Sequence, residues 1–278
     1  MLGGWSPDFR RVLAAFAVSS LGTKIAREAV PLTAVLVLQA GPGTMSLLGI
    51  AATLPTLLLG LFAGVFADRC RRRPLMIMAD LLRFVALASV PIVAWLGLLT
   101  IAQLLLAVVA VATLSLLFNA ADTAFLPDLV ERDRLVRANA TREAIDAATE
   151  VIGPPIGGVL VQTITAPLTL LIDALSYLAS ALCLLKVRHV EPIALPETVR
   201  RPVMHEIADG MRVLWRQPIL RPLLFARAIR TLFGGMLGPF YVIRHLGVSP
   251  ATMGVVIAVG GVASFAGAAL VPWLNARL

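Results

Sequence analysis

Three charged residues interrupt an apolar segment near the beginning of the chain. Lys24, Arg27 and Glu28 lie within residues 12–38, which are long enough to cross a bilayer as a helix. A charge at the bilayer centre costs at least about 2.5–3.5 kcal/mol, so we expect these side chains to face the interior of a helix bundle. Their i, i+3, i+4 spacing puts them on one face, where Lys24 and Glu28 can pair. They form either a midplane site for a substrate or proton, or an ion cluster that only fixes helix packing.

Acidic residues recur on one face of a later apolar segment, residues 142–163. Glu143, Asp146 and Glu150 have the spacing i, i+3, i+7, and Arg142 is expected to pair with Asp146. Glu150 lies roughly 10–12 Å deeper than Arg142, at about 1.5 Å of rise per residue. Burial disfavours the charged form of a carboxyl group. Because no cation is assigned to it, Glu150 is predicted to carry a proton or to bind a ligand.

An aspartate and a cluster of arginines join two of the long apolar runs. Arginines alone anchor a loop at a membrane surface, and a carboxylate adds nothing to that role. Asp68 therefore gives this loop a specific partner. The alternative is plain interfacial anchoring. The residues that carry the pattern are Gly64, Asp68, Arg69, Arg72 and Arg73.

Glycine and proline are concentrated in residues 153–158, one turn after Glu150. Pro154 removes a backbone donor and is expected to bend the helix. Gly153 and Gly157 are one turn apart, and such a pair lets another helix approach closely. With Gly158 they form a predicted helix-bend element.

The elements that carry these residues are predicted to be membrane-spanning helices. Apolar residues make up 59% of the chain and charged residues 14%, far from the averages of soluble proteins. No water is available inside lipid, so apolar runs of this length must be helical. The fold class is therefore an all-α membrane protein of about eight spans. They lie near residues 12–38, 45–66, 75–97, 101–121, 142–163, 168–187, 222–243 and 251–272.

The net charge of +8 has a topological explanation. If the N-terminus is cytoplasmic, nearly all the basic residues between the predicted spans fall on the cytoplasmic side, and Arg244 is the exception. This asymmetry is typical of multi-pass membrane proteins, and it accounts for the basicity without a nucleic-acid partner. No nucleophile–base arrangement, phosphate-binding glycine loop or cluster of metal ligands is present in the sequence. We expect neither an enzyme nor a bound cofactor or metal.

The predicted organisation has three parts. Residues 1–187 form an N-terminal half of six spans. Residues 188–221 are rich in proline and mixed charge, and they are predicted to be a cytoplasmic linker. Residues 222–278 hold two further spans, which the family resemblance given below implies to be an incomplete second half.

Several motifs resemble those of major facilitator transporters. The segment from Gly64 to Arg73 resembles the signature loop after their second helix, with Arg71 in place of its second glycine. This resemblance implies that the five pattern residues of the loop form a conformational latch, in which Asp68 holds a neighbouring helix end in one state and releases it in another. Other matches point to the efflux branch that contains macrolide-efflux and enterobactin-exporter-like proteins. They are residues 80–83, 127–130, 137–139, 153–158 and 173–177.

This resemblance implies a fold of two six-helix halves, so the chain would be a fragment or a truncated protein. It implies export of a small amphipathic compound of the drug, macrolide or siderophore class, by proton antiport with alternating access. The partners would be the substrate, protons and the lipid of a bacterial inner membrane. The alternatives are an importer or facilitator of the same fold, or a fragment that does not transport.

Overall fold

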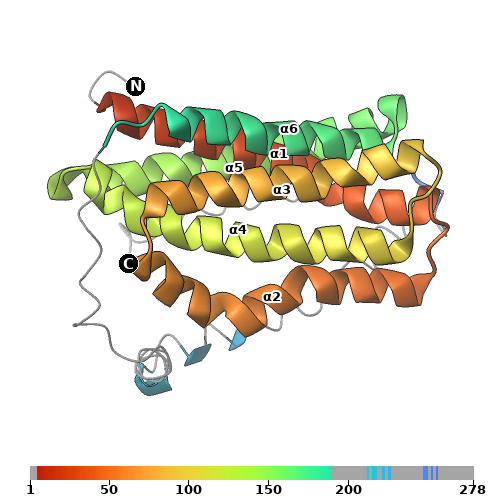
Figure 1. Ribbon diagram of the computed structural model, residues 1–278, viewed down its shortest axis with the longest axis horizontal. Coiled ribbons are helices and arrows are strands. Elements are labelled where there is room, and N and C mark those ends of the chain that lie inside the picture. The colour runs from red at the N-terminus through yellow and green to blue at the C-terminus, as the bar shows by residue number, and fades with distance from the viewer. Residues whose placement is uncertain are drawn as a thin grey trace, which may run out of the picture.

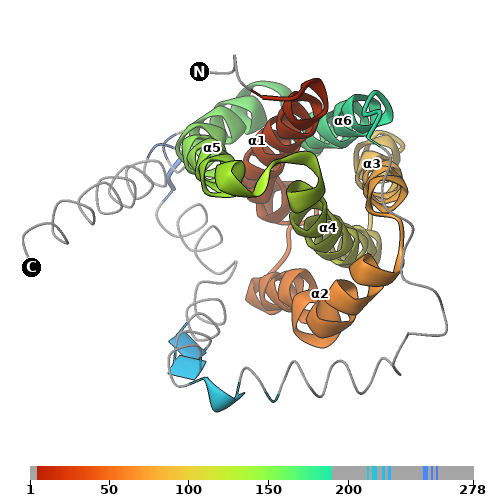
Figure 2. The same ribbon diagram turned by 90° about the vertical axis from the view of Figure 1, so that its left-hand side faces the viewer.

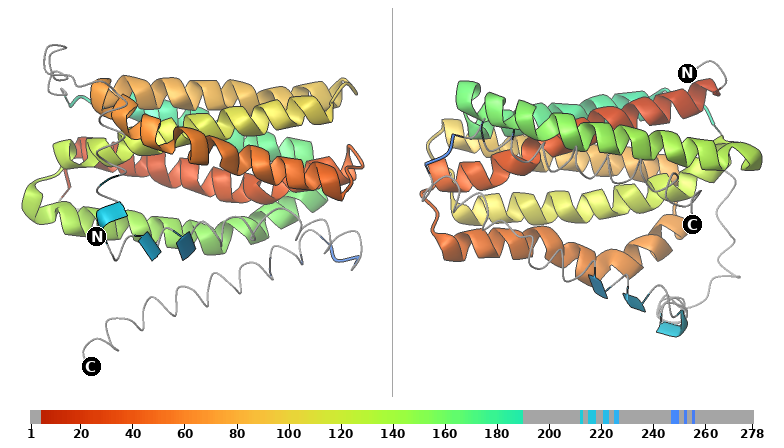
Figure 3. Two further views of the ribbon diagram at one scale, coloured as in Figure 1. Left: turned by 90° about the horizontal axis from the view of Figure 1, so that it is seen from below. Right: turned by 180° about the vertical axis from the view of Figure 1, so that it is seen from behind.

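The described part of the chain is a bundle of long helices. The computed structural model describes residues 5–189 and, beyond them, residues 212, 215–217, 221–222, 225–226, 247–249, 252 and 255. The helices are α1 (Pro7–Leu36), α2 (Pro42–Arg69), α3 (Arg72–Trp95), α4 (Ile101–Leu129), α5 (Leu135–Ile164) and α6 (Ala166–Leu185), with a short 3₁₀ turn η1 (Arg132–Arg134). They run along the long axis of the bundle (Figures 1 and 3).

Each of these six helices overlaps one of the first six predicted spans, so the all-α membrane fold is confirmed. Nearly all residues of the predicted seventh and eighth spans and of the predicted linker lie outside the described residues. The largest extensions beyond the predicted boundaries are in α4, which continues to Leu129, and in α5, which already starts at Leu135. Both extensions carry charged residues, because a helix can continue past the apolar layer into the polar interface.

Five described helices are long and apolar enough to cross a membrane. These spans are Pro42–Gly60, Arg72–Trp95, Ile101–Leu129, Arg132–Ile164 and Ala166–Leu185. At 30 residues, α1 is also long enough, but it carries Lys24, Arg27 and Glu28 near its middle. Its charged side chains therefore need partners on neighbouring helices.

The order of packing determines which helices can supply those partners. α1 packs against both α5 and α6, α6 packs against α3, α3 against α4, and α4 against α2. Seen along the bundle, the helices follow a curved path in the order α5, α1, α6, α3, α4, α2 (Figure 2). α2 therefore stands at one edge, and many of its large apolar side chains are exposed, among them Leu54, Leu57, Leu58 and Phe62. An exposed apolar face of this kind contacts lipid or another helix in a membrane.

Glycines bring α1 close to both of its main neighbours. A Cβ atom added at Gly157 of α5 would lie 2.6 Å from the carbonyl oxygen of Ile25, and one added at Gly153 would lie against Lys24. On the other side of α1, a Cβ atom at Gly22 would lie 2.6 Å from Oδ1 of Asp173 in α6. These contacts place the charged face of α1 within reach of α5.

Candidate functional site

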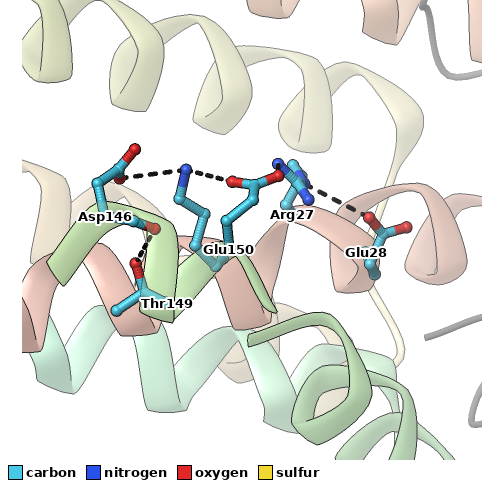
Figure 4. A network of polar contacts seen from close by, with 6 residues as sticks. Arg27, Glu28, Asp146, Thr149 and Glu150 are labelled. Carbon is cyan, nitrogen blue, oxygen red and sulfur yellow. Dashed lines mark hydrogen bonds and ion pairs between the residues drawn. The ribbon is translucent and has the colours of Figure 1, made fainter. Parts of the chain in front are cut away.

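The charged residues of α1 and α5 form one network of ion pairs. Lys24 Nζ lies 2.5 Å from Glu150 Oε2 and 3.3 Å from Asp146 Oδ1. Arg27 Nη1 donates to Glu150 Oε1 at 2.7 Å, and its Nε lies 3.5 Å from Glu28 Oε1. Figure 4 shows Glu150 of α5 facing Arg27 of α1. The structure thus brings together Lys24, Arg27, Glu28, Asp146 and Glu150, which we call the α1–α5 network, whereas Glu143 of the same acidic stripe is exposed and outside it.

Two predicted details of this network are wrong. Lys24 does not pair with Glu28, because its ammonium group turns to the acids of α5, and Arg27 contacts Glu28 instead. Glu150 is not an unpaired acid, since two cations bind its carboxylate. The close approach of α5 to α1 at Gly153 explains both differences, because it brings the acids of α5 nearer than an intrahelical partner.

The network is partly open to its surroundings. Side-chain exposure is 19% for Lys24, 41% for Arg27, 46% for Asp146 and 36% for Glu150, whereas Glu28 is 9% exposed. Two cations and three carboxylates give it a formal charge of −1. A ligand can therefore reach these groups, and the excess carboxylate favours a cationic one.

The predicted helix-bend element follows Glu150 on α5 and packs against α1. Gly153, Pro154, Gly157 and Gly158 are all buried. α5 runs as one helix from Leu135 to Ile164 through both of its prolines. The element's observed contact is the tight packing of Gly153 and Gly157 on α1. A role in bending or gating stays a prediction.

A second ion pair between helices involves a residue of α5 that lies outside the network. The Arg142 guanidinium binds Asp122 of α4 and stacks 4.5 Å from the ring centre of Phe16 in α1. The predicted pairing of Arg142 with Asp146 is therefore wrong. Asp122 is 1% exposed, and a buried carboxylate needs a cation more than a half-exposed one does.

The basic segment between α2 and α3 binds the ends of two other helices. Arg72 pairs with Asp128 near the end of α4. Arg73 donates from Nε to the carbonyl oxygen of Leu184 at 3.0 Å, and from Nη2 to that of Leu185 at 2.8 Å. Those carbonyls belong to the last turn of α6, where a cation also balances the helix dipole.

The remaining predicted latch residues are only partly described. Arg69 is the last residue of α2, and Gly64 lies in its final turns. The side chain of Asp68 lies outside the described residues. Its latch role therefore stays a prediction.

A third polar cluster lies in the bundle interior, and the sequence indicated only a weak candidate there, Asp173, which was not included in the predicted site. Arg83 of α3 binds Asp80 and lies between the rings of Phe118 and Tyr177, 4.3 and 4.4 Å from their centres. Asp173 of α6 is 2% exposed. The available signal was the occurrence of charged residues inside apolar spans, which membranes tolerate only when the charges are partnered or functional.

No group of three or more His, Cys, Asp or Glu side chains within the described ranges is placed to hold a metal ion. Both cysteines, Cys70 and Cys183, are free.

Comparison with known proteins agrees with the fold and the motifs. The family model described as Major Facilitator Superfamily matches residues 12–278. Multidrug efflux pump Tap of Mycobacterium tuberculosis (strain ATCC 25618 / H37Rv) is 32% identical over 193 residues, which cover 66% of this chain and 46% of Tap. An MFS-type transporter of Bacillus subtilis (strain 168), YfiS, is 27% identical over 212 residues, covering 75% of this chain and 49% of YfiS. The chain spans about half the length of the curated relatives it matches.

A solved structure shares the fold. It is the crystal structure of a bacterial homologue of the human lysosomal transporter Spinster, in an inward-facing and unoccupied conformation. The TM-score is 0.73 at 16% identity, and the match covers 99% of this chain and 65% of that one. The family predicted from the motifs is confirmed: the chain belongs to the major facilitator superfamily of membrane transporters.

Proposed function

We propose that this protein exports a small amphipathic compound, of the drug, macrolide or siderophore class, by proton antiport with alternating access. The observation that carries the proposal is the α1–α5 network, a set of partly exposed charged side chains in helices that cross the membrane. The similarity to Tap, a multidrug efflux pump, supports export over import.

The network has the properties of a binding site that can change its state. Glu150 binds both Lys24 and Arg27. A substrate cation that takes the place of either one would loosen the link between α1 and α5. Alternating access needs contacts between helices that break in one state and re-form in the other.

The arginines support a cytoplasmic N-terminus. Because the helices alternate in direction, the start of α1, the α2–α3 junction and the end of α4 lie at one end of the bundle (Figure 1). Among the described residues, this end carries most of the arginines outside the helix centres, including Arg72, Arg73, Arg132 and Arg134. Positive charge resists translocation, so we assign this end to the cytoplasm of the bacterial inner membrane.

The experiment that tests the proposal measures how much of a fluorescent lipophilic cation accumulates in cells with and without the protein. We expect lower accumulation in cells that contain it, and the difference should vanish when a protonophore removes the proton gradient. Higher accumulation would instead identify the alternative, an importer or facilitator. Equal accumulation across a panel of cationic, neutral and anionic compounds would refute export.

A matched pair of variants connects this measurement to the network. Glu150→Gln should lose the export difference because it removes the carboxylate that binds both cations. Glu143→Gln, an exposed position on the same helix outside the network, should retain it. Equal export by the two variants would show that export does not depend on the network.

A further inference from the structure

We propose that Asp173 of α6 is a proton-binding site, which exchanges its proton through the hydroxyls of Tyr177 and Thr23 with the exposed face of α1. The assignment of this proton to transport rests on the proposed antiport, whereas the binding of the proton does not. This site lies on the opposite side of α1 from the α5 acids.

Asp173 is buried where α6 packs against α1, and none of the ion pairs among the described residues involves it. It is 2% exposed, and the Ser176 hydroxyl donates to its Oδ1 at 3.1 Å. Tyr177 interacts with the same carboxyl group. Gly22 of α1 closes the site, since even a methyl group there would collide with Asp173.

Every charged group near this site is already matched with another one. From α3, the Arg83 guanidinium faces Asp173 but binds Asp80. From α4, Asp122 faces the same cluster and binds Arg142 of α5. Among the described residues of this cluster, three carboxyl groups therefore share two guanidinium groups, and Asp173 is the one left over.

The absence of a paired cation determines the protonation state of Asp173. An isolated carboxylate in a water-free interior pays a large desolvation penalty, which protonation removes. Asp80 and Asp122 avoid that penalty through their arginines. Asp173 avoids it by holding a proton, so the cluster as a whole is neutral.

A chain of hydroxyl groups connects Asp173 to the surface of the bundle. Tyr177 Oη and Thr23 Oγ1 are 3.1 Å apart, and Thr23 is exposed although Tyr177 is fully buried. Each hydroxyl can accept one proton and donate one, so a proton that enters from water at Thr23 leaves Tyr177 for the Asp173 carboxylate. Release runs through the same steps in reverse.

The opening of this route lies beside the α1–α5 network. Thr23 precedes Lys24 directly, and Arg27 follows one helical turn later on the same exposed face. Loss of the proton would make Asp173 compete with Asp80 for Arg83, which would alter the contact between α3 and α6. Proton release at Asp173 and rearrangement of α1 can thereby be coupled.

Infrared spectroscopy of the purified protein in lipid tests the bound proton directly. A protonated carboxylic acid has a carbonyl stretching band above the amide bands, and deuterated water shifts it. We expect such a band at neutral pH, its loss in Asp173→Asn, and its retention in Asp80→Asn. No difference between wild type and Asp173→Asn in this region would overturn the proposal.

Thermal unfolding gives an independent result. Asparagine resembles a neutral acid, so Asp173→Asn should unfold at nearly the wild-type temperature. Asp122→Asn should unfold at a lower temperature because it leaves Arg142 unpaired. If Asp173→Asn is destabilised as much as Asp122→Asn, or does not fold, Asp173 is ionised and the proposal is overturned.

Transport measurements then separate the proton site from the antiport. In liposomes, Asp173→Asn and Thr23→Val should lose transport driven by a pH gradient, while Thr33→Val, which removes a hydroxyl that donates to the Ala29 carbonyl of the same helix, should keep it. If the wild type shows no proton-driven transport, the proposed antiport fails, and the infrared band still decides the proton site. If Asp173→Asn transports normally on a pH gradient, its coupling role is overturned.

Discussion

Replacing Glu150 with glutamine tests how far the α1–α5 network stabilises the fold. The change preserves shape and removes the charge that binds Lys24 at 2.5 Å and Arg27 at 2.7 Å. Neither cation is left alone, since Lys24 keeps Asp146 at 3.3 Å and Arg27 keeps Glu28 at 3.5 Å. The loss should therefore be moderate.

The magnitude follows from the exposure of the partners. Removing one partner of a fully buried pair destabilises a protein by about 3–5 kcal/mol, whereas exposed pairs contribute about 0.2–1 kcal/mol each. Glu150 is 36% exposed and Arg27 is 41% exposed, so the two pairs together should contribute about 1–2 kcal/mol. In a chain of this size each kcal/mol lowers the melting temperature by about 2–4 °C.

The assay is thermal unfolding of the protein in lipid or detergent, with Glu143→Gln as the control. The control should change stability by less than about 0.5 kcal/mol because its side chain is exposed and outside the network. A double-mutant cycle with Lys24→Met should give a coupling energy of at least about 0.5 kcal/mol. A coupling energy of zero, or equal stability of the two glutamine variants, would refute the ion-pair geometry.

Three further changes test packing, topology and the latch. Gly157→Ala should destabilise the protein by about 1–3 kcal/mol because its methyl group would meet the Ile25 carbonyl. The control Gly60→Ala, with open space around it, should be neutral or stabilising. Equal melting temperatures of the two variants would contradict the α1–α5 contact. Cys70 should react with a membrane-impermeant thiol reagent from the cytoplasm, and Gly43→Cys from outside; reversed labelling would invert the topology. Asp68→Asn should insert normally and transport less, as measured by cellular accumulation, and unchanged transport would exclude the latch.

The sequence predicted which residues come together in the network, but not how they pair. Charges are so unfavourable in a membrane-length apolar segment that Lys24, Arg27 and Glu28 had to face other helices. Helical spacing then placed Asp146 and Glu150 on one stripe. Their partners depend on which helix lies alongside, and spacing along a single helix contains no such information.

The interior cluster was harder to predict for the same reason. Asp80 and Arg83 are three residues apart in α3 and pair locally, as a sequence can suggest. That Asp173 of α6 lies in the same cluster without a cation depends on the packing of α3 against α6. These two segments are more than eighty residues apart in the sequence, so no spacing pattern indicates that they are in contact.

The proton-driven export of an amphipathic compound is the central claim, and reconstitution into liposomes tests it most directly. The protein is placed in sealed liposomes with an imposed pH gradient, and uptake of a fluorescent lipophilic cation is followed, with protein-free liposomes as the reference. The account predicts protein-dependent uptake when the lumen is acidic, accompanied by proton release from the lumen and abolished by a protonophore. Uptake that is the same with and without the gradient, or that occurs without proton movement, would contradict it.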